Sequence, residues 1–402
     1  MRSVAFDWMT AVETQRIVDI FAAANAEMRF VGGCVRDAIL DRPSSDIDIA
    51  TDALPKRVQE ILRNANIKTI PTGIDHGTVT AIIDGRPFEI TTYRHDVKTD
   101  GRRAVVAFST DWREDAARRD FTINALSITP DGVLYDPFGG EADLLAGRIR
   151  FVGEARRRVR EDILRILRWF RFHAHFGRHP PDKEALAACR GFAYQIPNLS
   201  GERIRYELMR LLDAPHPISS LKLMMETDVI DAILGRGRRL ALITSLCEIE
   251  HTTEIPGDSF LRLAALIGTY STVDPIADRL RLATKERRRL NAALADTPTL
   301  DPGATVKQRR CALYGLDTNT ALDRIMLAWA ANPGEKRWGN WLETHRTFER
   351  PIFPLTGHDV TWLKATPAVG QVLKSAETWW IEKDFAPDRA ACLRYLKDLR
   401  TN

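Results

Sequence analysis

A glycine pair followed by two closely spaced aspartates constrains the fold of this chain more than any other feature. The predicted order is a strand at 28–31, a turn at Gly32-Gly33, a helix at 35–40 and a second strand at 46–50. Glycine lets the backbone turn tightly and approach a ligand closely. Residues two apart on a strand share a face, so we expect Asp46 and Asp48 to project into one pocket.

Two carboxylates this close repel each other unless a cation lies between them. Mg²⁺ suits that place, because it takes oxygen ligands and completes its shell with waters and substrate phosphates. Arg36 follows in the predicted helix, whose N-terminal N–H groups would face an anion. A glycine turn or an Asp-x-Asp pair alone is weak evidence, but their order within one short segment predicts a site for a metal-bound triphosphate.

Length and composition set the broad class of the protein. A chain of 402 residues is expected to hold two to four domains. It has no run of about eighteen apolar residues, so no membrane span is expected. The early acidic residues argue against a secretory signal. The five cysteines are scattered without a CxxC pair, which predicts free thiols, a cytoplasmic location and no zinc site.

Residues 1 to about 140 mix short strands with helices and predict an α/β head. The expected elements, besides those above, are a helix at 55–65 and strands at 78–84, 88–93, 123–129 and 133–135. The strands at 78–84 and 88–93 flank Gly85 and are predicted to form a hairpin. The polar segment 95–112 is expected to be a long functional loop.

After Gly139-Gly140 the sequence predicts helices almost exclusively. The first of them are expected at 160–175, 183–190, 202–213, 218–234, 239–249 and 258–270. The net charge is only +4, yet the segment 147–179 carries ten arginines against three acidic residues. A local basic stretch, rich in arginine rather than lysine, favours a nucleic-acid or nucleotide site over a solvated helical face.

Three further residues of the head are candidates for the same site. Glu89 lies on a predicted strand opposite Phe88 and Ile90, and is either a third carboxylate near the metals or a solvent-facing side chain. Arg118 and Arg119 precede an apolar strand and are candidates for holding phosphates, with Asp120 orienting one of them.

A second strong signal is the run Glu161 to Arg168. If it is one helix, the side chains of Asp162, Arg165 and Arg168 lie along one side of it, because positions three apart share a face. A surface ion pair is the plain alternative. Yet cytosine and adenine both present an exocyclic amine beside a ring-nitrogen acceptor, so an Asp/Arg pair would accept C and A and refuse U and G.

These residues resemble the class II tRNA nucleotidyltransferase/poly(A) polymerase family of the polymerase β superfamily. The motifs GGCVRD with DID, HGTVT with FEITTYR, RRDFTINAL, YDPFGG, REDILRILR and ERIRYEL occur in the family's order. The resemblance implies an α+β fold with a polymerase-β-like nucleotidyltransferase head (1–140) and an all-α neck (141–213), body (214–330) and tail (331–402).

The resemblance also implies roles for individual residues. Asp46 and Asp48 would be catalytic and bind Mg²⁺, with Glu89 a less certain catalytic residue. The nucleotide would be bound by Gly32, Gly33, Arg36, Arg119 and Arg168, with Asp162 and Arg165 reading the base. The helix from Glu202 and Arg203 would position the primer end or support the neck.

The implied activity is template-independent addition of CCA to the 3′ end of tRNA from CTP and ATP. A poly(A) polymerase and a partial CC- or A-adding enzyme are the alternatives within the family. The stretch Pro71 to Thr80 favours the tRNA enzyme, and the segment 95–112 favours full CCA addition. An RNA-binding protein without catalysis is the alternative of another class. The sequence does not indicate the oligomeric state.

Overall fold

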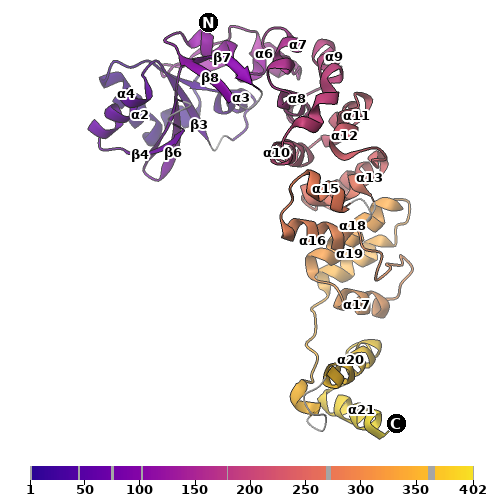
Figure 1. The fold of residues 1–402 in the computed structure, drawn as a ribbon. Helices are drawn as coiled ribbons and strands as arrows, with labels where there is room; N and C mark the ends of the chain where they lie inside the picture. Colours follow the sequence, from indigo (N-terminus) through magenta and orange to yellow (C-terminus); the bar gives the residue numbers. More distant parts are fainter. Residues whose placement is uncertain are drawn as a thin grey trace. The chain divides into compact units, whose positions relative to one another are not determined.

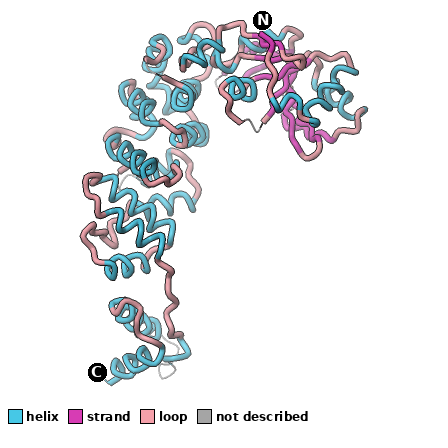
Figure 2. Tube along the Cα trace, turned by 180° about the vertical axis from the view of Figure 1, so that it is seen from behind, coloured by secondary structure: helices cyan, strands magenta, loops and turns pink. Residues whose placement is uncertain are grey.

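The computed structural model describes residues 2–43, 46–73, 77–100, 103–178, 180–268, 273–360 and 367–401. The chain divides into two compact units, residues 1–236 and 237–402 (Figure 1). The first unit holds every strand among the described residues, and the second is helical (Figure 2). The finer division into head, neck, body and tail stays a prediction.

An eight-stranded mixed sheet organises the first unit, in the order β1-β10-β9-β2-β3-β6-β5-β4. The strands are β1 (Arg2–Ser3), β2 (Met28–Val31), β3 (Ile47–Thr51), β4 (Lys68–Gly73), β5 (Thr78–Ile83), β6 (Arg86–Thr92), β9 (Ser127–Ile128) and β10 (Val133–Tyr135). The central pair β3 and β6 is parallel, while the other paired strands of this sheet run antiparallel.

A hydrophobic core fastens two helices to this sheet. Helices α2 (Val12–Ala23) and α4 (Pro55–Asn64) bury Phe21 and Leu62 against strand residues such as Ile49 and Phe88. Burying a large apolar side chain stabilises the fold by about 1.5–3 kcal/mol. The short helix α3 (Gly33–Ile39) follows β2 directly, so the packed sheet fixes the position of the glycine turn.

Most head elements agree with the sequence predictions within two residues, including the hairpin β5–β6 across Gly85. Two predictions are wrong. Residues 122–124 form a 3₁₀ turn, so the strand predicted at 123–129 shrinks to β9. The expected loop at 95–112 is instead a hairpin of β7 (Arg94–Asp100) and β8 (Arg103–Phe108), followed by helix α5 (Trp112–Ala117). Residues 101–102 of that segment lie outside the described residues.

Seven helices complete the described part of the first unit. They are α6 (Gly140–Ala146), α7 (Ala155–Glu161), α8 (Leu164–Phe176), α9 (Lys183–Phe192), α10 (Gly201–Leu212), α11 (Pro217–Glu226) and α12 (Val229–Leu234). The helix predicted at 160–175 is therefore two helices, interrupted at Asp162 and Ile163, and the one predicted at 218–234 is also two.

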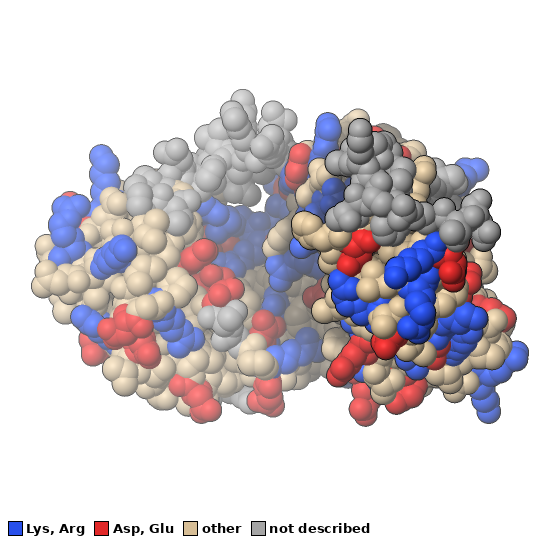
Figure 3. All heavy atoms as spheres, turned by 90° about the horizontal axis from the view of Figure 1, so that it is seen from below, with Lys and Arg blue, Asp and Glu red and all other residues tan. Residues whose placement is uncertain are grey.

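The second unit consists of helices throughout its described residues. They are α13 (Leu240–Thr252), α14 (Ser259–Ile267), α15 (Val273–Arg279), α16 (Thr284–Ala293), α17 (Val306–Tyr314), α18 (Thr318–Ala331), α19 (Trp338–Thr347), α20 (Pro367–Glu382) and α21 (Arg389–Thr401). The last residues of the helix predicted at 258–270 fall in the gap at 269–272, outside the described residues. Among the described helices none is both long and apolar enough to cross a membrane. Basic and acidic side chains are intermingled on the face drawn in Figure 3, among many residues of neither kind.

Candidate active site

Strand β3 and the residue just before it carry the paired carboxylates at the centre of the sheet. Ile47 and Ile49 are buried in the core, so the half-buried Asp48 between them faces the other way. The strand begins one residue later than predicted, and the exposed Asp46 immediately precedes it. In the parallel ladder Asp48 is the partner of Glu89 on β6, so an exposed glutamate lies beside it.

The electrostatics of Asp48 reflect this crowding. Burial raises its pKa to about 6, and the charges of Glu89 and Asp46 add to the effect. Arg119 and Arg36 pull the pKa the other way without cancelling the rise. The two arginines therefore leave part of the negative charge uncompensated, and a cation at this point would relieve the repulsion.

The carboxylates of Asp46 and Asp48 are chemically suited to bind Mg²⁺. Within the described ranges no group of three or more His, Cys, Asp or Glu side chains is arranged to enclose a metal ion. Mg²⁺, however, is commonly bound through one or two carboxylates together with water and substrate phosphates. Asp46 and Asp48 offer such a partial set of oxygen ligands.

Gly32 is required by its backbone and by its neighbours. It has φ +74°, which L side chains rarely adopt, and a Cβ here would lie 3.1 Å from Arg119 Nη1 and 3.4 Å from Asp48 Oδ2. The glycine therefore lies between a cationic and an anionic group and leaves the space between them open for a ligand.

The arginines facing this space are held by carboxylates and an amide. Arg118 and Arg119 both pair with the buried Asp115, at 2.7 and 3.2 Å. Arg36 Nη1 donates to Asn124 Oδ1 at 2.8 Å. The prediction that Asp120 orients one of the two adjacent arginines is wrong, since Asp115 has that role and is one helical turn away on α5.

Asp120 instead binds Arg168, with Arg168 Nε 2.6 Å from Asp120 Oδ2. Although burial pushes the pKa of Asp120 upward, the charge of Arg168 and the hydrogen bond from Asn124 outweigh it and hold the pKa at about 2. Asp120 is therefore ionised at neutral pH, and Asn124 connects it to Arg36.

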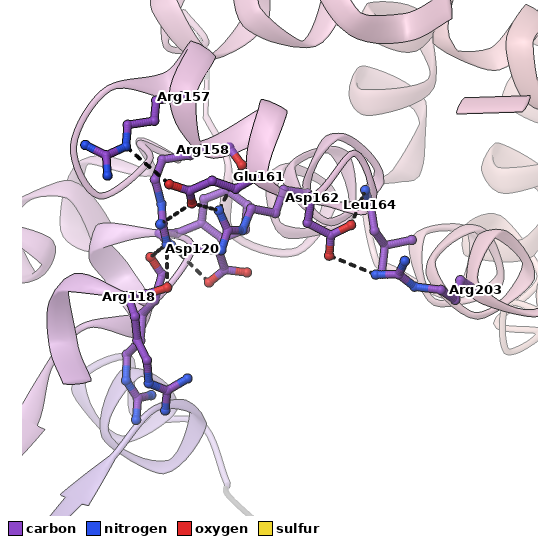
Figure 4. A network of polar contacts seen from close by, with 11 residues as sticks. Arg118, Asp120, Arg157, Arg158, Glu161, Asp162, Leu164 and Arg203 are labelled. Carbon is purple, nitrogen blue, oxygen red and sulfur yellow. Dashed lines mark hydrogen bonds and ion pairs between the residues drawn. The ribbon is translucent and has the colours of Figure 1, made fainter. Parts of the chain in front are cut away.

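The structure corrects the predicted helical face at Asp162. This residue ends α7 in an extended conformation, with φ −152° and ψ 112°, and its carboxylate accepts a hydrogen bond from Leu164 N at 3.0 Å. Its other oxygen accepts from Arg203 Nη2 at 2.8 Å, on the side away from Glu161 (Figure 4). Asp162 therefore lies in a turn, and only Arg165 and Arg168 lie on α8.

One cavity of about 410 Å³ nevertheless collects most of the predicted site. Ten residues that the sequence indicated line it, namely Gly32, Gly33, Arg36, Asp48, Arg118, Arg119, Asp120, Asp162, Arg165 and Arg168. Asn124 and Phe172 complete the lining. Asp46 and Glu89 are not in that lining. They act on the site electrostatically, because their negative charges raise the pKa of Asp48.

Sequence reasoning missed Asp115, Asn124 and Glu161 as members of the site. Glu161 accepts hydrogen bonds from Arg165 Nη1 at 2.6 Å and from Arg158 Nη1 at 2.5 Å. The spacing of Asp115 before Arg118 and Arg119 was a usable signal, because carboxylates and arginines three or four apart on a helix can pair. The contact of Asn124 with Arg36 joins segments that are 88 residues apart, and it left no local signal.

Comparisons with known proteins agree with this geometry. The Poly A polymerase head domain family matches residues 28–150, and the family described as probable RNA and SrmB-binding site of polymerase A matches residues 180–235. The matched head region includes the glycine turn and both aspartates, and the chain is a nucleotidyltransferase.

Relatives of known activity narrow the class. The human mitochondrial CCA tRNA nucleotidyltransferase 1 is 32% identical over 99% of this chain and 92% of its own length. The CCA-adding enzyme of Leuconostoc citreum is 38% identical over 60% of this chain and 59% of its own. The chain belongs to the CCA tRNA nucleotidyltransferase family. The crystal structure of the Bacillus stearothermophilus CCA-adding enzyme in complex with CTP is also similar, with a TM-score of 0.77, 28% identity and coverage of 97% of both chains.

Proposed function

We propose that this protein adds C, C and A to the 3′ end of tRNA, using CTP and ATP without a nucleic-acid template. The observation that carries the proposal is the single cavity that joins Asp48 and the phosphate-facing arginines to Asp162 and Arg165. A nucleotide bound there would have its phosphates held at one end of the cavity and its base at the other. The protein itself can then select the base, which addition without a template requires.

The phosphate end of the cavity consists of Gly32, Arg36 and Arg119. Arg36 is directed by Asn124, and Arg119 is directed by Asp115, so both guanidinium groups are oriented before a ligand arrives. Preorientation lowers the cost of holding a triphosphate in position for in-line attack. Mg²⁺, held by Asp46 and Asp48, would supply activation of the tRNA 3′-hydroxyl and stabilisation of the leaving pyrophosphate.

The base end of the cavity consists of Asp162 and Arg165. A carboxylate accepts from the exocyclic amine of cytosine or adenine, and a guanidinium donates to the ring nitrogen beside it. Arg203 keeps Asp162 oriented, and Glu161 keeps Arg165 oriented. We infer that UTP and GTP are refused because they present the opposite order of donors and acceptors.

The experiment that tests this function uses tRNA lacking its 3′ CCA and each labelled nucleotide in turn. The proposal expects CMP incorporation from CTP alone and AMP incorporation only after two cytidines. If Asp46→Ala left incorporation unchanged, the active-site assignment would be wrong. A wild-type chain that incorporates no nucleotide would instead be an RNA-binding protein that keeps the fold without catalysis.

Poly(A) synthesis is the second candidate, because the matched head family is described as that of poly A polymerase. A long adenosine ladder from ATP without CTP would favour it. A product ending at CC would indicate a partial enzyme instead. The stretch favouring the tRNA enzyme includes residues 74–76, which lie outside the described residues. A cytoplasmic location stays a prediction, since three of the relatives are mitochondrial proteins.

A further inference from the structure

Arg158 lies outside the cavity yet contacts residues at both of its ends. It is on α7, its side chain is only 10% exposed, and it is absent from the residues that line the cavity. Its Nη1 donates to Glu161 Oε2 at 2.5 Å, and its Nη2 donates to the carbonyl oxygens of Arg118 and, at 2.6 Å, of Arg119.

Through Glu161, Arg158 is connected to Arg165 at the base end of the cavity. The same oxygen, Glu161 Oε2, also accepts from Arg165 Nη1 at 2.6 Å, and Arg165 Nη1 is 2.8 Å from the carbonyl oxygen of Arg158. Arg158 and Arg165 therefore share one carboxylate oxygen. Figure 4 shows Arg158 beside Glu161 in this network. A displacement of either guanidinium changes the position available to the other.

The carbonyl end leads to the phosphates. Arg118 and Arg119 follow α5, and their side chains line the cavity and pair with Asp115. Arg158 binds the backbone carbonyls of Arg118 and Arg119 rather than their side chains. It therefore holds the backbone of these two residues in position and leaves their guanidinium groups available to a bound phosphate. Hydrogen bonds from a charged donor are about twice as strong as those between neutral groups, so the guanidinium of Arg158 holds this backbone segment strongly.

We propose that Arg158 is a positioning residue that couples base recognition to phosphate binding. This inference rests on the proposed function, since it assumes that a nucleotide occupies the cavity. Arg158 sets the distance between Arg165 and the segment Arg118-Arg119, so that base and triphosphate of one nucleotide engage together. Without it each end still binds its own part of the nucleotide, but the two are no longer held at matched positions.

A neighbouring arginine provides a matched control. Arg157 also contacts Glu161, at 3.3 Å from Oε1, but its side chain is 77% exposed and the structure gives it no hydrogen bond to Arg118 or Arg119. Arg157→Gln and Arg158→Gln thus remove the same charge from the same carboxylate. They differ in the connection to the phosphate end.

The test compares three ligands as inhibitors or substrates of CMP incorporation: CTP, cytidine and inorganic tripolyphosphate. For Arg158→Gln we expect the KM for CTP to rise on the order of tenfold, while the inhibition constants of cytidine and tripolyphosphate stay within about twofold of wild type. Arg157→Gln should leave the constants of all three ligands at their wild-type values. Arg158→Lys keeps the charge but cannot span both carbonyls and the carboxylate, so it should reproduce the split to a smaller degree.

Two results would overturn the inference. One is Arg158→Gln behaving like Arg157→Gln. The other is an equal loss for all three ligands, which indicates general damage to the site rather than lost coupling. If Arg158→Gln does not fold, the same criteria apply to Arg158→Lys. A wild-type protein that incorporates no CMP refutes the proposed function instead, and so the two failures are distinguishable.

Discussion

Replacing Asp48 by the isosteric asparagine should stabilise the protein when no divalent metal is present. The pKa of Asp48 rises from an ordinary 3.8 to about 6, first through burial and then through Glu89. Because a change of one pKa unit corresponds to about 1.4 kcal/mol, keeping Asp48 ionised in the folded state costs about 3 kcal/mol near pH 7.5. Asp48→Asn removes that cost together with the charge.

The sign of the pH dependence follows from the same shift. The folded-state pKa is raised, so the cost is complete above pH 6 and shrinks as the pH falls toward 3.8. At pH 5 the advantage of the variant should be roughly half of its value at pH 7.5. Adding Mg²⁺ should narrow the difference at pH 7.5, because the wild type gains binding energy that the variant lacks.

Urea denaturation followed by tryptophan fluorescence, in EDTA and then in Mg²⁺, measures these differences. Of the nine tryptophans, Trp8, Trp112 and Trp169 lie in the unit that contains Asp48. The exposed Asp19, on α2, provides a control, since Asp19→Asn should change stability by less than about 0.5 kcal/mol at either pH. A destabilised Asp48→Asn protein in EDTA, or a difference independent of pH, would refute the claim that uncompensated negative charge gathers at this site.

Three other changes test separate parts of the site. Asp120→Asn leaves Arg168 with only the longer contact to Glu207, at 3.7 Å, and should cost about 3 kcal/mol of stability at pH 7, measured by urea denaturation. Since the pKa of Asp120 is lowered to about 2, the difference should disappear only as the wild type is acidified toward that value. Asp162→Ala should lower the preference for CTP and ATP over UTP and GTP by a factor of about ten in competition assays, and unchanged selectivity would contradict base reading by Asp162. Gly32→Ala should raise the KM for CTP on the order of tenfold, because its Cβ enters the gap between Arg119 and Asp48, whereas Gly85→Ala, at a similar φ with open space around it, should not.

Local chemistry made the head predictable. Alternation around Asp48 with buried isoleucines indicated the strand, and the glycine pair indicated the turn that follows β2. The hairpin β7–β8 escaped prediction because its segment is polar and contains Gly101, features typical of a loop. Pairing between two strands can compensate for weak local propensity, and a single sequence does not reveal it.

The site was predictable as a set of residues but not as a set of contacts. The apolar spacing runs through Asp162 without a break, so it predicted one helix, although an aspartate that hydrogen-bonds two residues onward favours a turn. The partners of Asp162 and Asp120 lie 41 and 48 residues away in sequence. Such pairings depend on how α7, α8 and α10 pack, which only the structure shows.

The central claim is that one cavity joins a metal-dependent nucleotidyl transfer centre to a reader of C and A. Incorporation of each of the four labelled nucleotides into tRNA lacking its 3′ CCA tests it most directly. The account predicts two CMP from CTP alone, one further AMP when ATP is also present, and no addition from UTP or GTP. Efficient UMP or GMP addition, or an adenosine ladder without CTP, would contradict it.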